Sequence, residues 1–204
     1  WLGLVGIADP PRAGAAEVID RARSAGIRTI MLTGDHPRTA AAIASALRLP
    51  GTDAPVAGEQ LEHLDWSDAA AVNATLESTD VFARVTPEHK LELVRALQQS
   101  GNIVAMTGDG VNDAPALRRA DIGVAMGGVG TDVAREAADM VLADDDFATI
   151  VTAIEEGRNI FADIRKFLRY LLASNAGEVL VMVLGVLAAG SLGLQTGEGL
   201  AVPL

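Results

Sequence analysis

"IVAMTGDGVNDAP", residues 103–115, is the stretch that decides how this chain folds. An apolar run typical of a buried β-strand leads directly into a Thr-Gly-Asp tripeptide that ends at Asp109, and a second aspartate, Asp113, follows four residues later. Carboxylates this close repel each other unless a cation lies nearby, and their oxygens suit Mg²⁺ together with phosphate oxygens and water. The simpler alternative is that Asp113 only caps the following helix, whose first turn contains Pro115.

The same tripeptide occurs earlier, at Thr33, Gly34 and Asp35, again directly after an apolar run. In an open parallel sheet, ligands bind beyond the carboxyl ends of the strands, so the two copies predict one shared crevice. A threonine hydroxyl and backbone N–H groups freed by glycine suit phosphate oxygens. Either copy alone would be weak evidence, because glycine and aspartate are ordinary turn residues.

Strand-like and helical patterns alternate along the first 150 residues. The pattern predicts strands at 2–8, 27–32, 80–84, 102–107, 122–126 and 139–143. One intervening helix should stop at Gly26, and another should begin at Pro87 and stop at Gly101. This alternation predicts an α/β fold, a mostly parallel sheet with helices on both faces, with residues 51–79 as a loop and short helices at its edge.

Composition narrows the class of protein. The formal charge is −11, from 16 basic and 27 acidic residues, which opposes a nucleic-acid partner because such proteins need a basic surface. The absence of cysteine excludes disulfides and cysteine-ligated zinc. The sequence opens within an apparent strand and without methionine, so we expect a fragment.

Residues 171–194 carry one charged side chain in 24 residues. About 20 apolar residues span a bilayer, so we expect a transmembrane helix; a buried core helix is the alternative. Arg165, Lys166 and Arg169 precede it and favour the cytoplasmic side, and Tyr170 fits an interfacial anchor. The segment is therefore expected to lie among membrane lipids.

The predicted organisation follows from this change in composition. We expect a cytoplasmic domain (1–150), a stalk helix (151–170), a transmembrane helix (171–194) and an extracytoplasmic loop (195–204). The stalk and span are expected to share one long helix, with Gly157 as its weakest point. The plasma membrane is the expected location.

Two polar residues, Asn175 and Glu178, interrupt the apolar segment and fall on one helix face. A charge at mid-bilayer costs about 2.5–3.5 kcal/mol and usually marks a pathway or a site, so we expect cation coordination. The alternative places Glu178 near the interface, where it could snorkel or pair. A further acidic run, "ADDDF" (143–147), is expected to cap a helix rather than bind metal.

Together these residues resemble a known family. "MTGDGVNDAPAL" is similar, nearly letter for letter, to the hinge signature of P-type cation-transporting ATPases, with the calcium-pump branch as the nearest match. The similarity continues through "DPPR" (9–12), "TGD" (33–35), "ARVTPEHK" (83–90), "DMVLADDDF" (139–147) and "KFLRYLLASNAGEV" (166–179). The resemblance implies a haloacid-dehalogenase-like phosphorylation domain, then the fifth transmembrane helix of a pump that transfers the γ-phosphate of ATP to an aspartate.

The resemblance also implies roles for individual residues. At the phosphoryl group, Thr33 and Gly34 would make contact, Asp35 would support their loop, and Lys90 would neutralise charge. Asp109 would bind Mg²⁺, and Asn112 and Asp113 would complete the phosphate and metal surroundings. Asn175 and Glu178 would coordinate the transported cation, Ca²⁺ or another divalent ion. Without the resemblance, a lone lysine would be a solvated helix residue. Mg²⁺, ATP and the other domains and helices of the pump are the implied partners.

One departure from the family pattern is serious. The nucleophile of the family lies in an Asp-Lys-Thr-Gly-Thr motif, which this sequence lacks. Asp9 follows an apolar run, but Pro10 and Pro11 stand where lysine and threonine are needed. The isolated chain is therefore predicted to be inactive. The competing hypotheses are a membrane-anchored, non-catalytic remnant that binds Mg²⁺ and phosphate or regulates another pump, and a freestanding phosphatase that would use Asp9.

Overall fold

The computed structural model describes residues 10–52 and 54–191. The strand expected at 2–8, Asp9 and the loop expected at 195–204 lie outside the described residues. Contacts divide the chain into two units, Trp1–Thr152 and Ala153–Leu204.

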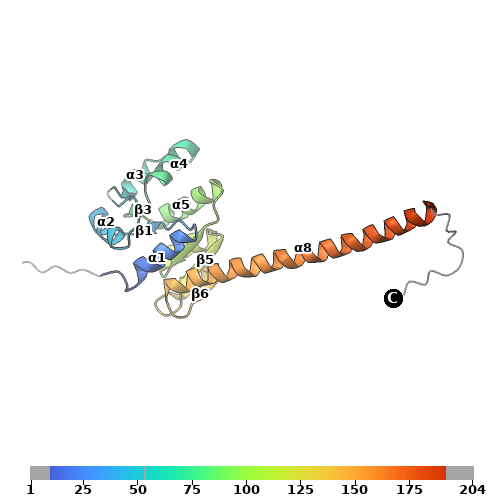
Figure 1. Ribbon diagram of the computed structural model, residues 1–204. Helices are drawn as coiled ribbons and strands as arrows, with labels where there is room; N and C mark the ends of the chain where they lie inside the picture. The colour runs from blue at the N-terminus through green and yellow to red at the C-terminus, as the bar shows by residue number, and fades with distance from the viewer. Residues whose placement is uncertain (1–9, 53, 192–204) are drawn as a thin grey trace, which may run out of the picture. The chain divides into compact units, whose positions relative to one another are not determined.

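Strands and helices alternate through the first unit (Figure 1). The strands are β1 (Met31–Leu32), β2 (Val56–Ala57), β3 (Val81–Ala83), β4 (Ala105–Gly108), β5 (Ile122–Met126) and β6 (Met140–Leu142). The helices are α1 (Ala15–Ser24), α2 (Pro37–Ala46), α3 (Gly58–Glu62), α4 (Ala69–Ser78), α5 (Pro87–Gln99), the short 3₁₀ helix η1 (Val111–Asp113), α6 (Ala114–Arg119), α7 (Asp132–Ala137) and α8 (Phe147–Ser191).

All strand pairs among the described residues are parallel, as predicted. They form two three-stranded sheets, in the orders β1-β3-β2 and β4-β5-β6. Strand β1 is shorter than the expected 27–32, because only Met31 and Leu32 find ladder partners in β3. In a parallel arrangement the loops after β1, β3, β4 and β5 leave from the carboxyl ends of the strands.

Helices cover both faces of the first sheet, which confirms the predicted layering. The side chains of β3 alternate between two clusters, because successive residues of a strand point to opposite faces. Phe82 packs with residues of α3, α4 and α5, whereas Val81 and Ala83 pack with residues of α1 and α2. All three side chains are fully buried.

The second sheet shares its core with the first. Met106 of β4 and Ala125 of β5 pack against α5, α6 and α7. Leu32 of β1 packs against this cluster and also against the cluster around Phe82. Packing thus joins the strands that carry the two Thr-Gly-Asp loops.

Local signals placed the ends of α5 correctly. Helix α5 begins at Pro87, and the backbone turns out of the helix at Gly101, whose φ of 83° suits glycine. Residues 51–79 hold more structure than expected, since β2 pairs with β3 as an edge strand and α4 has 10 residues. Only two residues of β2 form its ladder, which is too short a pattern to detect in the sequence.

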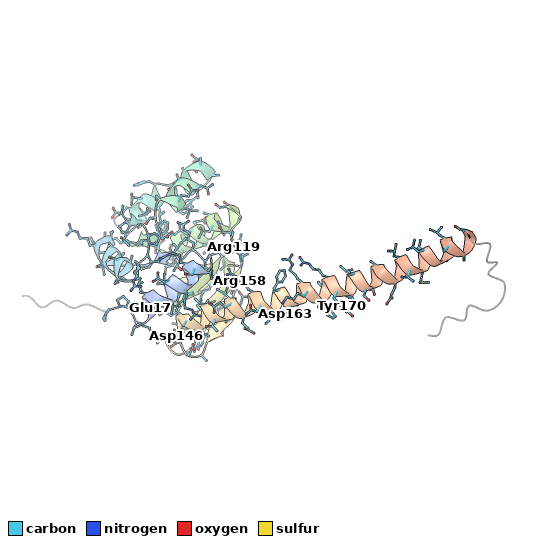
Figure 2. All side chains as sticks on the ribbon, in the orientation of Figure 1. Glu17, Arg119, Asp146, Arg158, Asp163 and Tyr170 are labelled. Atoms are coloured by element: carbon cyan, nitrogen blue, oxygen red, sulfur yellow. The ribbon has the colours of Figure 1, made fainter. Side chains whose placement is uncertain are left out.

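One continuous helix, α8, carries the chain from the first unit through the second. It runs for 45 residues without a break at Gly157, so the expectation of one long helix is confirmed. Its most apolar stretch has a mean hydropathy of 1.9 and is 0% buried, whereas the core helix of a soluble protein is mostly buried. By length and composition, the helix could cross a membrane. Side chains such as Asp163 and Tyr170 project from its surface (Figure 2).

Candidate functional site

The loop after β1 carries the first Thr-Gly-Asp tripeptide. The Thr33 hydroxyl accepts the N–H of Asp35 at 3.1 Å. The loop is tied to the loop after β3, because Val85 N–H donates to Thr33 O and Arg84 N–H donates to Asp35 O, both at 3.0 Å. Gly34 is exposed, with no heavy atom within 4 Å of the position a Cβ would take. The result is an open loop with a fixed backbone.

The loop after β4 is organised by the carboxylate of Asp113, a residue that is buried. Its Oδ2 accepts the N–H of Asp109 at 3.3 Å and that of Gly110 at 3.1 Å. Its Oδ1 lies 2.6 Å from the ammonium nitrogen of Lys90. The side chain makes no capping bond to α6, so the simple capping interpretation of Asp113 is wrong.

Lys90 reaches this loop from the first turn of α5. The helix starts at the N-cap Thr86, whose hydroxyl accepts the N–H of His89 at 3.3 Å. The side chains of Lys90 and Asp113 are only 17% and 9% exposed, so little water screens the pair. The interpretation of Lys90 as a solvated helix lysine is therefore wrong, and the lysine holds a positive charge at the carboxyl edge of the strands.

Glycine at position 108 is what allows this arrangement. A Cβ there would lie 2.4 Å from Cβ of Asp113 and 2.7 Å from its Cγ. No side chain fits between them, so the strand end and the carboxylate can touch only if residue 108 is glycine. The second Thr-Gly-Asp thus needs its glycine for close approach.

Asp109 and Asn112 are left open to solvent. Within the part of the chain that the structure describes, the Asp109 carboxylate makes no hydrogen bond or ion pair. An unpaired, exposed carboxylate beside a fixed lysine fits a Mg²⁺ ion that takes one protein carboxylate, substrate phosphate and water. A metal site built from protein ligands alone does not fit, because no group of three or more His, Cys, Asp or Glu side chains suited to a metal occurs among the described residues.

A third loop, after β5, supports the second one. Thr131 N–H donates to Asp109 O at 2.8 Å. This glycine-rich loop is held by Asp145, whose carboxylate accepts the N–H of Gly128 at 2.9 Å and of Val129 at 3.0 Å. These hydrogen bonds lower the pKa of Asp145, and the one from Gly128 has the largest effect. The sequence pattern did not reveal this role, since Asp145 lies within an acidic run.

The other two members of that run bond near the start of α8, and Asp146 caps the helix as expected. Asp146 accepts the N–H of Ala148 at 2.9 Å at the start of α8. Asp144 accepts the hydroxyl of Thr149 at 2.7 Å, and this bond is the main cause of its lowered pKa. Neither carboxylate belongs to a metal-binding group among the described residues.

Arg84 is a site neighbour that the sequence left undistinguished. It directly follows β3 with a left-handed φ of 51°, and its backbone N–H bonds to Asp35 O. Its guanidinium lies 3.6 Å from the carboxylate of Glu59 on α3. The only signal available was its place in "ARVTPEHK", six residues before Lys90.

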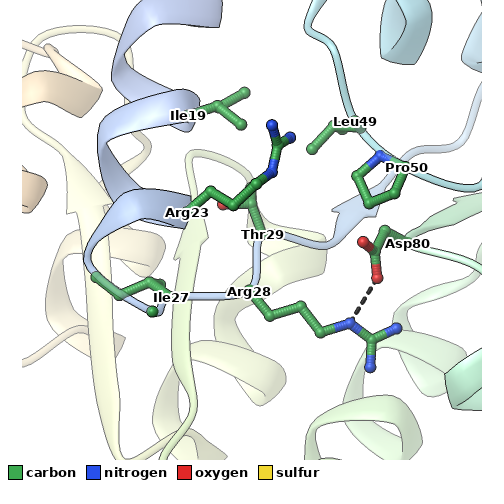
Figure 3. Close-up of a pocket in the computed structure, with 9 residues that line it drawn as sticks. Ile19, Arg23, Ile27, Arg28, Thr29, Leu49, Pro50 and Asp80 are labelled. Carbon is green, nitrogen blue, oxygen red and sulfur yellow. Dashed lines mark hydrogen bonds and ion pairs between the residues drawn. The ribbon is translucent and has the colours of Figure 1, made fainter.

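The remaining predicted residues and the pocket lie elsewhere. Asn175 and Glu178 lie in α8, in the second unit, and both are exposed. A pocket of about 300 Å³ is lined by residues that precede β1 and β3, among them Thr29 and Asp80 (Figure 3). It lies at the amino ends of these strands, the opposite edge from the Thr-Gly-Asp loops. Its polar wall is the Arg28–Asp80 ion pair, 2.5 Å between Nε and Oδ1. It is therefore separate from the candidate site.

Comparison with known proteins agrees with this architecture. The sequence matches two models of haloacid dehalogenase-like hydrolases, one over residues 1–121 and the other over residues 89–154. A crystal structure of a zinc-transporting PIB-type ATPase in the E2.Pi state aligns with a TM-score of 0.67 and 35% identity, covering 87% of this chain and 24% of the other. The predicted fold class is confirmed.

Curated relatives are cation-transporting ATPases. The calcium-transporting ATPase of Bacillus subtilis (strain 168) is 58% identical over 189 residues, which cover 92% of this chain and 21% of the relative. The probable cation-transporting ATPase F of Mycobacterium tuberculosis (strain ATCC 25618 / H37Rv) is 53% identical over 193 residues, with the same shares. The chain thus spans about a fifth of the length of these relatives, and the predicted resemblance to P-type ATPases is confirmed.

Proposed function

The chain belongs to the haloacid dehalogenase-like hydrolases, and on this premise we propose that it is part of an ATP-driven cation pump of the P-type. The observation that carries the proposal is the ion pair between Lys90 and Asp113 beside the open carboxylate of Asp109. Phosphoryl transfer depends chiefly on positioning and on neutralising charge. This site offers both at the carboxyl ends of parallel strands.

Each group at the site has a distinct task in this proposal. Lys90, fixed by Asp113, neutralises charge on the phosphoryl oxygens, and Thr33 and Gly34 bind those oxygens through the hydroxyl and backbone N–H groups. Asp35 supports their loop through its backbone bond to Arg84. Asn112, exposed beside Asp113, donates its amide to phosphate.

Mg²⁺ is the cofactor that suits Asp109, and it would supply further positive charge opposite the phosphate. Asp113 contributes to its surroundings indirectly, by fixing the N–H groups of Asp109 and Gly110. The γ-phosphate of ATP is the group transferred, and an aspartate elsewhere in the pump accepts it. Residues 1–204 alone would then not hydrolyse ATP.

Transport is assigned to the apolar part of α8. The described part of the apolar segment 171–194 forms the transmembrane helix and residues 151–170 the stalk. The domain of residues 1–150 lies in the cytoplasm, residues 195–204 lie outside, and lipid of the plasma membrane surrounds the span. Asn175 and Glu178 coordinate a divalent cation, because both offer hard oxygen ligands. Calcium is favoured, since the Bacillus subtilis relative is named a calcium-transporting ATPase.

The test is the Asp109→Asn variant of the complete protein that carries this sequence. Phosphoenzyme formed from ATP labelled at the γ position should fall at least about a hundredfold, the usual effect of removing one such electrostatic group. Asp68→Asn is the matched control, because asparagine caps α4 as well as aspartate does. Normal labelling of Asp109→Asn would refute the assignment.

A second candidate is a membrane-anchored regulator that binds Mg²⁺ and phosphate without turning over. The open carboxylate of Asp109 beside the Lys90–Asp113 pair would suit such binding as well. A complete protein that binds phosphate with Mg²⁺, loses that binding in Asp109→Asn, and forms no phosphoenzyme would support this candidate over the pump.

A further inference from the structure

His89 is a buried titratable side chain that the proposed mechanism does not use. It is 8% exposed and lies in the first turn of α5, directly before Lys90. The ring Nδ1 of His89 accepts the backbone N–H of Thr86 at 3.3 Å, and the backbone N–H of His89 donates to the Thr86 hydroxyl at 3.3 Å. These reciprocal bonds close the start of the helix.

The imidazole also lies close to the start of α3, next to the loop after β3. A Cβ on Gly58, the first residue of α3, would lie 3.4 Å from Nδ1 of His89 and 2.2 Å from O of Arg84. The loop that contains Arg84 is the one bonded to Thr33 and Asp35. His89 is therefore bonded to the loop after β3, which adjoins the first Thr-Gly-Asp loop, and directly precedes Lys90, which pairs with Asp113 in the second.

We propose that neutral His89 is a positioning residue, which fixes the first turn of α5 so that Lys90 faces the phosphoryl site, and that protonation of His89 releases this turn and slows phosphoryl transfer. The inference deepens the proposed function and rests on it. It predicts that acid slows phosphorylation of the pump, and that the residue responsible, His89, touches neither the phosphate nor the metal.

The chemistry of the imidazole gives the direction of the effect. Nδ1 accepts the Thr86 N–H only when it carries no proton, and the doubly protonated ring has no acceptor left. Imidazole changes its charge within the physiological range, and a cation is unfavourable at a helix N-terminus. The charged groups around His89 are Glu59 of α3, Arg84 of the loop after β3, and Glu88 and Lys90 of α5 itself.

Another helix of this chain uses a side chain that does not titrate as the hydrogen-bond acceptor at the same position. At the start of α3, the side-chain oxygen of Gln60 accepts the N–H of Ala57 at 2.8 Å, from the same helix position that His89 occupies in α5. The His89→Gln variant should therefore keep the cap and lose the pH response. His89→Leu should lose the cap at every pH.

The first measurement is the initial rate of phosphoenzyme formation in the complete protein at pH 7.5 and pH 5.5. The rate of His89→Gln divided by that of wild type should rise about fivefold on acidification, the usual effect of losing one helix cap. The exposed His63, at the end of α3, provides the control His63→Gln, which should follow wild type at both pH values. A ratio for His89→Gln that stays constant with pH would overturn the proposal.

The second measurement does not depend on activity. Amide hydrogen exchange of the peptide covering residues 84–92 should be faster in wild type than in His89→Gln at pH 5.5 and equal at pH 7.5, with His89→Leu fast at both. Equal protection at pH 5.5 would also overturn the role of His89. If wild type forms no phosphoenzyme, the pump assignment fails, and the exchange result alone decides whether His89 controls the turn.

Discussion

The two Thr-Gly-Asp loops share the same three residues but differ in how closely they are packed. The loop after β1 is open: Gly34 has no near neighbour for an added Cβ, and Asp35 is exposed. The loop after β4 is packed: Gly108 touches Asp113, which in turn bonds to Lys90. The tripeptide alone does not set this difference; the residues that follow it do.

The two loops differ in whether they need a fixed charge. The first loop presents backbone N–H groups and a hydroxyl, which can bind phosphate without a buried ionic network. The second presents charged groups, which must be held in position to favour a charged transition state. Substitutions in the second loop should therefore do more damage than equivalent substitutions in the first.

The largest effect is expected from Asp113→Ala. It leaves the Lys90 ammonium and two backbone N–H groups without their buried partner, a loss of about 3–5 kcal/mol, so the thermal unfolding midpoint of the first unit should fall by roughly 10 °C. Calorimetry of the complete protein in detergent measures it. Asp163→Ala, which breaks an exposed pair with Lys166, is the control and should shift the midpoint by less than about 3 °C. Equal shifts would contradict the buried network.

The two glycines provide a matched pair of substitutions. Gly108→Ala places its Cβ 2.4 Å from Cβ of Asp113, and such overpacking costs about 1–3 kcal/mol, so both the unfolding midpoint and phosphoenzyme formation should drop. Gly34→Ala meets no atom within 4 Å, and its midpoint should stay within about 1 °C of wild type. If Gly34→Ala destabilised the protein as much as Gly108→Ala, the contrast between the loops would be refuted.

The smallest effect concerns the support of the second loop by Asp145. The pKa of Asp145 is lowered from 3.8, first by the N–H of Gly128, so its stabilising contribution is present above pH 3.8 and is lost as the pH falls through its lower folded value. Asp145→Asn tolerates the φ of 53° at this position. Its unfolding midpoint should lie below that of wild type at pH 7, with a difference that shrinks below pH 3.8. A difference independent of pH would exclude the carboxylate as its source.

The fold could be predicted from sequence where a local pattern was strong. The helix of residues 87–99 has proline at its start and glycine after its end, and both signals act through the local backbone. The edge strand β2 escaped prediction, because two residues have no detectable period. Long-range pairing alone makes Val56 and Ala57 a strand.

The candidate site was predictable as a set of residues but not as a set of contacts. The spacing of Asp109 and Asp113 predicted a pair of carboxylates around Mg²⁺, but it did not show that only Asp109 is open and that Asp113 is engaged by Lys90, 23 residues earlier. Side-chain partners so far apart in sequence depend on how α5 packs. The same reason hid the role of Asp145, whose backbone partners lie 16 and 17 residues before it.

The uninterrupted course of α8 has a mechanical consequence. At a rise of 1.5 Å per residue, its 45 residues extend for roughly 68 Å, and Glu178 lies about 46 Å along the axis from Phe147. Because no residue among Phe147–Ser191 breaks the hydrogen-bonded ladder, the helix has no hinge of its own. Gly157, Gly177 and Gly185 are the positions where its backbone would bend most readily.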